Sequence, residues 1–207
     1  MISITVMAHP RRKVMAEALA GTVDARVVWD EKNDRADTGC RAIIAHDPAA
    51  THHLVLQDDA IPCDRLTERV THALRRVPVR SPLSLYLGKP NPMGREMTEI
   101  AAKADQLGAS YIVMGRLLWG VAIVYPTVII PELLAWCDGS KVPQYDRRVS
   151  RWFQSQHIDC WYTWPSLVDH DDGPSLHHPR ARADGRRARR WIGADTPDWT
   201  GPILLSS

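Results

Sequence analysis

The sequence is short of several features that would point to particular protein classes. Its four cysteines form no C-x-x-C pair, which argues against a zinc knuckle. No apolar run reaches the ~18 residues of a membrane-spanning helix, because Gly120 and Pro126 interrupt the longest one, residues 117–130. No basic segment precedes the apolar start, as a signal peptide would require. Together these absences predict a soluble, cytoplasmic protein with free thiols.

The common nucleotide-binding signatures are missing as well. The chain has neither a G-x-G-x-x-G fingerprint nor a G-x-x-x-x-G-K-[ST] loop. Its 207 residues are 44% hydrophobic and 24% charged, with a formal net charge of +2. This composition is ordinary for a globular protein of one domain with, at most, a small appendage. The net charge does not by itself predict a polyanionic partner.

Strand-like and helix-like segments alternate over about the first 165 residues. Apolar, β-branched runs predict strands at 2–8, 26–29, 53–57, 82–87, 112–114, 121–125 and 160–164. Amphipathic spacing and end signals predict helices at 11–20, 38–46, 64–77, 95–107, 131–136 and 146–157. The βαβαβ opening predicts parallel strands and a doubly wound, three-layer α/β sheet. Pro10, Asp30 and the pair Asp58 and Asp59 should then share the rim where such sheets bind ligands.

The composition changes at about residue 173, which predicts a body of residues 1–172 and an Arg/Pro/His-rich C-terminal arm of residues 173–207, extended or loosely ordered. Six arginines lie between residues 180 and 190, with only Asp184 to offset them, and Trp191 follows. Such a run can follow phosphates and stack a base. The candidate nucleic-acid contacts are Arg182, Arg186, Arg187, Arg189 and Arg190. A solvated tail, or a patch for an acidic protein or membrane surface, is the simpler alternative.

The strongest local signal is the strand at 53–57, which runs directly into Asp58 and Asp59. Adjacent carboxylates repel each other, and burying either one without compensation is unfavourable. A divalent cation relieves both problems, and Mg²⁺ or Mn²⁺ prefers carboxylate oxygens. His170 could supply a further ligand. The alternatives are a solvated acidic turn and a surface histidine in an acidic loop.

Other positions carry weaker signals. Asp30, after the second strand, could accept a hydrogen bond from a nucleotide, or it could lie in a surface turn. Thr38 and Gly39 are expected to open a helix, and a helix N-terminus accommodates phosphate. Gly120 marks either the approach of a ligand or close packing. Asp146, at a helix start, is either a cap or a general base for an acceptor hydroxyl.

In chain order, V-W-D, N…TG-x-R-A, the strand into D-D, W-G-x-A, the helix-start Asp and P-S-L-V-x-H resemble the GT-A glycosyltransferases over roughly residues 2–170. The likeness is greatest to the small, phage- or bacterial-like members with an L-E-D-D-type motif, although Gln57 replaces an acid of that motif. The resemblance implies a GT-A-like, Rossmann-type three-layer sandwich with a mostly parallel central sheet. It also implies that Asp59 and His170 bind Mn²⁺ or Mg²⁺.

The same resemblance implies a nucleotide-diphosphate sugar as donor, with a UDP-sugar favoured, and Asp146 as the group that activates the acceptor. The implied donor contacts are Asp30, Asn33, Arg41, Asp58, Trp119 and Gly120. The acceptor could be a hydroxymethylated base in DNA, reached through the basic arm, or a hydroxyl of a protein or glycan. Two other classes stay open: a non-catalytic nucleic-acid-binding protein and a metal-dependent phosphohydrolase that uses the aspartates and His170.

Overall fold

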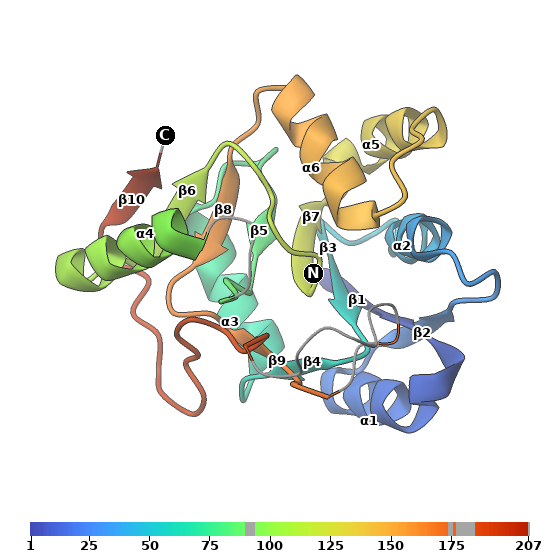
Figure 1. Ribbon diagram of the computed structural model, residues 1–207, viewed down its shortest axis with the longest axis horizontal. Coiled ribbons are helices and arrows are strands. Elements are labelled where there is room, and N and C mark those ends of the chain that lie inside the picture. The colour runs from blue at the N-terminus through green and yellow to red at the C-terminus, as the bar shows by residue number, and fades with distance from the viewer. Residues whose placement is uncertain (90–93, 174–175, 177–184, 207) are drawn as a thin grey trace.

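The computed structural model describes residues 1–89, 94–173, 176 and 185–206 (Figure 1). Its main sheet has eight strands in the order β10-β6-β8-β5-β7-β3-β1-β2. These strands are β1 (Ile2–Ala8), β2 (Arg26–Trp29), β3 (His52–Gln57), β5 (Leu83–Ser84), β6 (Tyr111–Met114), β7 (Ala122–Pro126), β8 (Cys160–Thr163) and β10 (Ile203–Ser206). A second, two-stranded sheet pairs β4 (Ala60–Pro62) with β9 (Val168–His170).

Helices cover both faces of the main sheet. They are α1 (Lys13–Val23), α2 (Arg35–Ile44), α3 (Leu66–Ala73), α4 (Gly94–Leu107), α5 (Ile130–Asp138) and α6 (Tyr145–Ser155), with short 3₁₀ turns η1 (Pro10–Arg12), η2 (Leu74–Arg76) and η3 (Thr127–Ile129). The buried core on one face includes residues of α2, α4, α5 and α6. The core on the other face includes residues of α1 and α3. Because β3 is covered on both faces, its sequence contains the continuous apolar run Leu54–Leu56 instead of alternating apolar and polar residues.

The predicted three-layer α/β architecture with a mostly parallel sheet is confirmed. β1 pairs in parallel with both β2 and β3, and the pairs β5–β8 and β6–β10 are also parallel. The pairs β3–β7, β5–β7 and β6–β8 are antiparallel. The parallel group β3-β1-β2 is the part of the sheet that the βαβαβ opening predicted, and its carboxyl ends meet at one rim.

Three local expectations were wrong. Helix α2 begins at Arg35 because the Asp34 carboxylate caps it and accepts hydrogen bonds from the N–H groups of Ala36 and Asp37. Thr38 and Gly39 therefore lie inside the helix, and the expected phosphate-binding N-terminus is not there. The first helix passes through Gly21 and ends at Val23, followed by a left-handed residue. The expected strand at 82–87 is regular only at β5.

The described C-terminal residues pack on the body instead of extending from it. β10 pairs with β6 at the edge of the main sheet, and Ala188, Ile192 and Leu204 are buried. Arg182 lies outside the described residues, and the division of the chain at residue 173 stays a prediction. Across the part of the chain that is described, no helix combines the length and the apolarity needed to cross a membrane. All four cysteines are free.

Candidate active site

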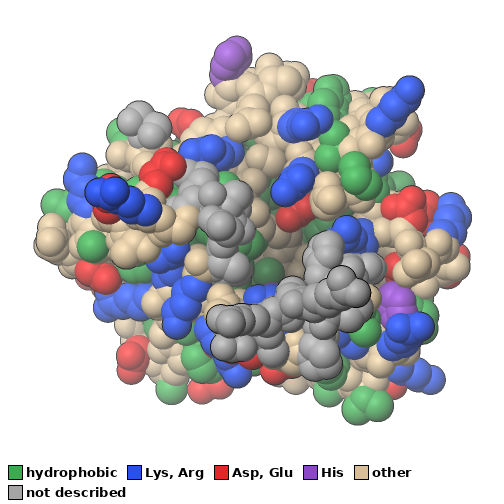
Figure 2. All heavy atoms as spheres, in the orientation of Figure 1, with side chains coloured by type: hydrophobic (Ala, Val, Ile, Leu, Met, Phe, Trp, Pro, Cys, Tyr) green, Lys and Arg blue, Asp and Glu red, His purple; other side chains and the backbone are tan. Residues whose placement is uncertain are grey.

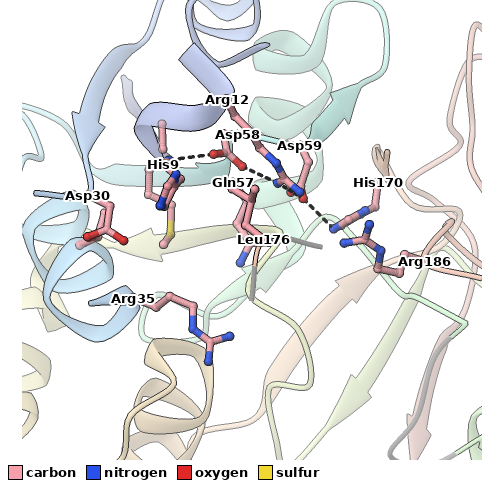
Figure 3. A pocket seen from close by; sticks show the side chains of 13 residues that line it. His9, Arg12, Asp30, Arg35, Gln57, Asp58, Asp59, His170, Leu176 and Arg186 are labelled. Atoms are coloured by element: carbon pink, nitrogen blue, oxygen red, sulfur yellow. Dashed lines mark hydrogen bonds and ion pairs between the residues drawn. The ribbon is translucent and has the colours of Figure 1, made fainter. Parts of the chain in front are cut away.

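A cavity of about 200 Å³ lies at the carboxyl ends of β1, β2 and β3 (Figure 3). Charged side chains and one histidine, from separate parts of the chain, line it: Arg12, Asp30, Arg35, Asp58, Asp59, His170 and Arg186. The neighbouring strand ends bring the three aspartates to one rim, as the sequence predicted. The two predicted metal ligands, Asp59 and His170, meet here.

The small sheet explains how His170 reaches the acid pair. β4 begins directly after Asp59, and Ala60 pairs with His170 of β9. The Asp171 N–H also donates to the Asp59 carbonyl oxygen at 2.9 Å. These backbone bonds place His170 Nε2 3.4 Å from Asp59 Oδ2. A strand pairing between distant segments therefore builds the centre of the site.

The His170 ring is oriented by a backbone contact. Its Nδ1 lies 2.6 Å from the Asp171 carbonyl oxygen, which can only accept a hydrogen bond, so Nδ1 carries the proton. In the neutral ring, Nε2 then presents its lone pair towards Asp59. Histidines that bind metals are commonly oriented by a backbone carbonyl in this way. A lone pair facing a carboxylate favours a cation between them.

Arg12 is the main site residue that the sequence analysis missed. Its Nη1 donates to Asp58 Oδ1 at 2.8 Å and also to Asp59 Oδ2. The His9 N–H donates to Asp58 Oδ2 at 2.8 Å, so both Asp58 oxygens are engaged.

Burial raises the pKa of Asp58, against the opposing effects of the His9 N–H and Arg12. Burial lowers the pKa of Arg12, but the two aspartates outweigh this and the net pKa is raised. The run H-P-R-R immediately after the first strand was the available signal.

Asp59 differs from Asp58 in one respect that matters for metal binding. Its Oδ1 is buried and has no hydrogen-bond partner among the described residues. Such an orphaned carboxylate oxygen is costly unless a ligand satisfies it. No group of three or more His, Cys, Asp or Glu side chains in the described ranges is arranged to hold a metal ion. However, Mg²⁺ commonly uses one or two carboxylates together with substrate phosphates. Asp59 Oδ1 and His170 Nε2 therefore fit such an ion when a ligand completes its coordination.

The predicted donor contacts divide into two groups. Asp30 lines the cavity, and its Oδ1 accepts from the Asp34 N–H at 3.0 Å, which fixes the carboxylate. Arg41 instead pairs with Asp37 and donates to the Trp29 carbonyl oxygen. Asn33 is exposed in a left-handed turn. Neither Arg41 nor Asn33 lines the cavity, whereas Arg35, which was not predicted, does.

Gly120 has a packing role. A Cβ added there would lie 2.6 Å from the Tyr145 ring, and one added at Gly39 would lie 2.5 Å from it. Tyr145 also donates a hydrogen bond to the Gly120 carbonyl oxygen. Both glycines therefore make room for one buried ring. Trp119 packs edge-on against Tyr86 with ring centroids 5.9 Å apart and does not line the cavity.

Asp146 is the second residue of α6 and does not cap the helix, since Gln144 stands at the cap position. Its Oδ1 accepts from the Arg147 N–H at 2.8 Å. Burial raises the pKa of Asp146, and the positive charge of Arg35 opposes the rise. Arg35 lines the cavity and Asp146 does not. The predicted base therefore lies outside the lining of the cavity, close enough to Arg35 to feel its charge.

The described arginines of the C-terminal run are bound to the chain itself. Arg187 pairs with Asp169 and Asp172, and Arg190 pairs with Asp105. Arg189 donates to Thr98 and to carbonyl oxygens, one of them that of Gly88 at 2.9 Å. The Arg186 guanidinium donates to the Gly173 carbonyl oxygen. On the face shown in Figure 2, basic and acidic side chains are interspersed rather than gathered into one basic patch.

No protein-family profile matches the chain, and no curated protein matches it. The chain is similar to a mutant Drosophila β-1,4-galactosyltransferase 7 in complex with manganese, UDP-Gal and xylobiose. The identity is 8% and the TM-score 0.45, over 88% of this chain and 75% of that one. It is also similar to a glycosyltransferase involved in glycosylation of the major capsid of PBCV-1, with 11% identity and a TM-score of 0.38 over 86% of this chain and 96% of that one. At this level of likeness, neither structure assigns a function to this chain.

Proposed function

We propose that this protein is a glycosyltransferase that moves a sugar from a nucleotide-diphosphate sugar to an acceptor hydroxyl, with Mn²⁺ or Mg²⁺ as cofactor. The observation that carries the proposal is the cavity at the ends of β1, β2 and β3. It combines a buried acid pair, an orphaned Asp59 oxygen and a histidine with arginines that line the same cavity. Carboxylates for a metal beside guanidinium groups for phosphates are the recognition chemistry that a metal-bound diphosphate requires.

The donor half of the site has separable roles. Asp59 and His170 would hold the cation, which, when bound, neutralises the diphosphate and stabilises it as a leaving group. Arg35 and Arg186 line the cavity and offer the planar donor groups that suit phosphate oxygens. Asp30 offers a fixed carboxylate that can accept a hydrogen bond from a hydroxyl of the nucleotide. The preference for uridine rests on the GT-A resemblance of the sequence.

In the transfer step, Asp146 would take up the proton of the acceptor hydroxyl. The bond between the sugar C1 and the diphosphate oxygen breaks, and its electron pair leaves with the diphosphate. The acceptor oxygen bonds to C1, and in an inverting reaction its proton passes to the Asp146 carboxylate. A pKa raised by burial suits a carboxylate that must take up a proton near neutral pH. In a retaining reaction, Asp146 would only position the acceptor.

For the acceptor, a hydroxymethylated base in DNA is one candidate and a protein or glycan hydroxyl is the other. The density of arginine after residue 180 supports DNA. The pairing of Arg187 and Arg190 with carboxylates of the chain weighs against it, because a guanidinium already paired gains less from a phosphate. The two are separated by offering the purified protein hydroxymethylated DNA and a panel of glycans and peptides with a radiolabelled donor.

The first test is thermal stability against nucleotide diphosphates and nucleotide sugars, with and without Mn²⁺. A ligand at 100 times its dissociation constant should add about 2.7 kcal/mol to the free energy of unfolding. We expect a metal-dependent shift for one nucleotide, lost in Asp59→Asn. The matched control is Asp105→Asn, which alters an exposed carboxylate on α4 that pairs with Arg190. The absence of any nucleotide shift in the unaltered protein would refute the proposal.

The same variant separates the other two classes. A non-catalytic nucleic-acid-binding protein would keep its salt-dependent nucleic-acid affinity in Asp59→Asn. A phosphohydrolase would release phosphate from the donor with no acceptor present. A glycosyltransferase instead yields the labelled acceptor and a nucleoside diphosphate in equal amounts.

A further inference from the structure

Arg12 lies where a cation shared by the two aspartates would lie. One of its nitrogens, Nη1, bonds to an oxygen of Asp58 and to an oxygen of Asp59. The three side chains are well buried, with exposed fractions of 14% for Arg12, 8% for Asp58 and 6% for Asp59. A guanidinium in this position does for the acid pair what a bridging metal ion would do, because it reduces the repulsion between the carboxylates.

The pairing with Arg12 compensates Asp58 and Asp59 unequally. Within this trio, two carboxylates and one guanidinium leave one negative charge. The Asp58 oxygens are both engaged, by His9 N–H and by Arg12. Asp59 has one engaged oxygen and one buried oxygen without a partner, and the lone pair of His170 Nε2 faces the engaged one. The free coordination capacity of the site is therefore at Asp59, next to the bond that Arg12 makes.

We propose that Arg12 is a built-in competitor of the divalent cation, and that it moves from Asp59 to the donor phosphate when the metal binds. A metal ion on Asp59 would lie close to the guanidinium, and two cations repel strongly where the effective dielectric is low. The bond between Arg12 and Asp59 must therefore break as the metal enters. Arg12 lines the same cavity as Arg35 and Arg186, so a phosphate bound there is within the same compartment.

The exchange has a thermodynamic consequence. Without nucleotide, the metal must displace Arg12 from Asp59 and no phosphate is present to receive the guanidinium, so the metal binds weakly. With nucleotide present, the phosphate receives Arg12, so the metal binds more tightly. By linkage, the metal must raise the nucleotide affinity by the same factor. The phosphate half of this inference rests on the proposed function, whereas the competition between Arg12 and the metal does not.

The test is Mn²⁺ binding, measured by the electron paramagnetic resonance signal of free Mn²⁺, with and without UDP. The variants are Arg12→Gln, Arg12→Lys and the control Arg11→Gln, which removes the same charge from the exposed neighbour. Arg12→Gln should bind Mn²⁺ alone at least about tenfold more tightly than the unaltered protein. It should also lose most of the UDP-induced gain. Arg12→Lys keeps a competing charge and should stay within about threefold of the unaltered protein, as should Arg11→Gln.

Each other result is decisive. If Arg12→Gln binds Mn²⁺ no more tightly than Arg11→Gln does, the competition is refuted. If Arg12→Gln is unfolded without metal, millimolar Mn²⁺ should restore its fold by supplying the missing positive charge, and failure to do so also refutes the proposal. If Arg12→Gln gains Mn²⁺ affinity but no protein in the set responds to UDP or to another nucleotide, the competition stands and the proposed donor function fails.

Discussion

The rim cavity and the C-terminal arginine run are both dense in charge, but their charges are satisfied in different ways. In the run, Arg187 and Arg190 are 43% and 53% exposed. Arg190 pairs with the exposed Asp105, and Arg187 covers the buried Asp169 from the surface. In the cavity, the acid pair is buried, and one Asp59 oxygen has no partner in the described chain. A surface pair such as Arg190–Asp105 contributes about 0.2–1 kcal/mol. A buried polar atom left unsatisfied is the stronger indication of a ligand.

The largest effect should come from the orphaned oxygen. Asp59→Asn keeps the shape of the side chain and removes the charge that would bind the metal. We expect a loss of sugar transfer of more than about 100-fold, since even residues that only support a metal ligand cost 10–100-fold. Asp105→Asn, which breaks a pair of the arginine run, should transfer within twofold of the unaltered protein. Initial rates with labelled donor measure both, and equal losses would remove the distinction between the two regions.

The next effect tests how α6 is held beside the cavity. Gly39→Ala places a Cβ 2.5 Å from the Tyr145 ring, so it should destabilise the protein by about 1–3 kcal/mol. Gly21→Ala, also inside a helix, meets nothing within 4 Å and should stabilise by about 0.5–1 kcal/mol. Urea unfolding measures the two opposite signs. A destabilised Gly39→Ala protein that keeps its nucleotide shift but transfers poorly would place Tyr145 in the positioning of Asp146.

A pH-dependent effect follows from the burial of Asp146. Its pKa is raised by burial in the folded state, so the protonated side chain favours folding and the ionised side chain opposes it. Its stabilising contribution is present below the unfolded pKa of about 3.9 and is lost as the pH rises through the folded value. Asp146→Asn should therefore gain stability relative to the unaltered protein between acidic and neutral pH. Denaturant midpoints across that range test the sign, and a constant difference between the two proteins contradicts it.

The smallest effect should come from the arginine run. Arg190→Gln removes a half-exposed ion pair with Asp105 and should change stability by less than about 1 kcal/mol. It should leave the Mn²⁺-dependent nucleotide shift unchanged. Thermal melts with and without nucleotide give both quantities. A loss of DNA binding in this variant, with donor binding intact, would move the run from a structural to an acceptor-binding role.

The strands and the position of the rim could be predicted from the sequence, whereas the side-chain contacts across the rim could not. Apolar runs located β1, β3 and β7, and chain order placed Asp58 and Asp59 at a strand end. Arg12 was missed because its partners are an acid pair far along the chain, which no local pattern reveals. The start of α2 was misplaced because Asp34 and Thr38 are both good caps, and only the fold decides between them.

The arginine run was misinterpreted for the same reason, because its partners are also distant in sequence. A cluster of arginines with few acids nearby in sequence is typical of an exposed basic arm. The carboxylate that pairs with Arg190 belongs to Asp105, which is far away in sequence. The roles of Gly39 and Gly120 were hidden for a related reason: both glycines are required by Tyr145, which comes from another helix. Local patterns specify elements, whereas partners across the fold decide what a charge or a small residue does.

The pairing of β4 with β9 also sets when the site can exist during folding. Asp59 and His170 are separated by a long stretch of chain that contains several strands of the main sheet. The entropy of closing so long a loop must be offset before this contact is rewarded. A ligand that needs both side chains therefore recognises only the completed fold, and it should slow unfolding while leaving the rate of early folding steps unchanged.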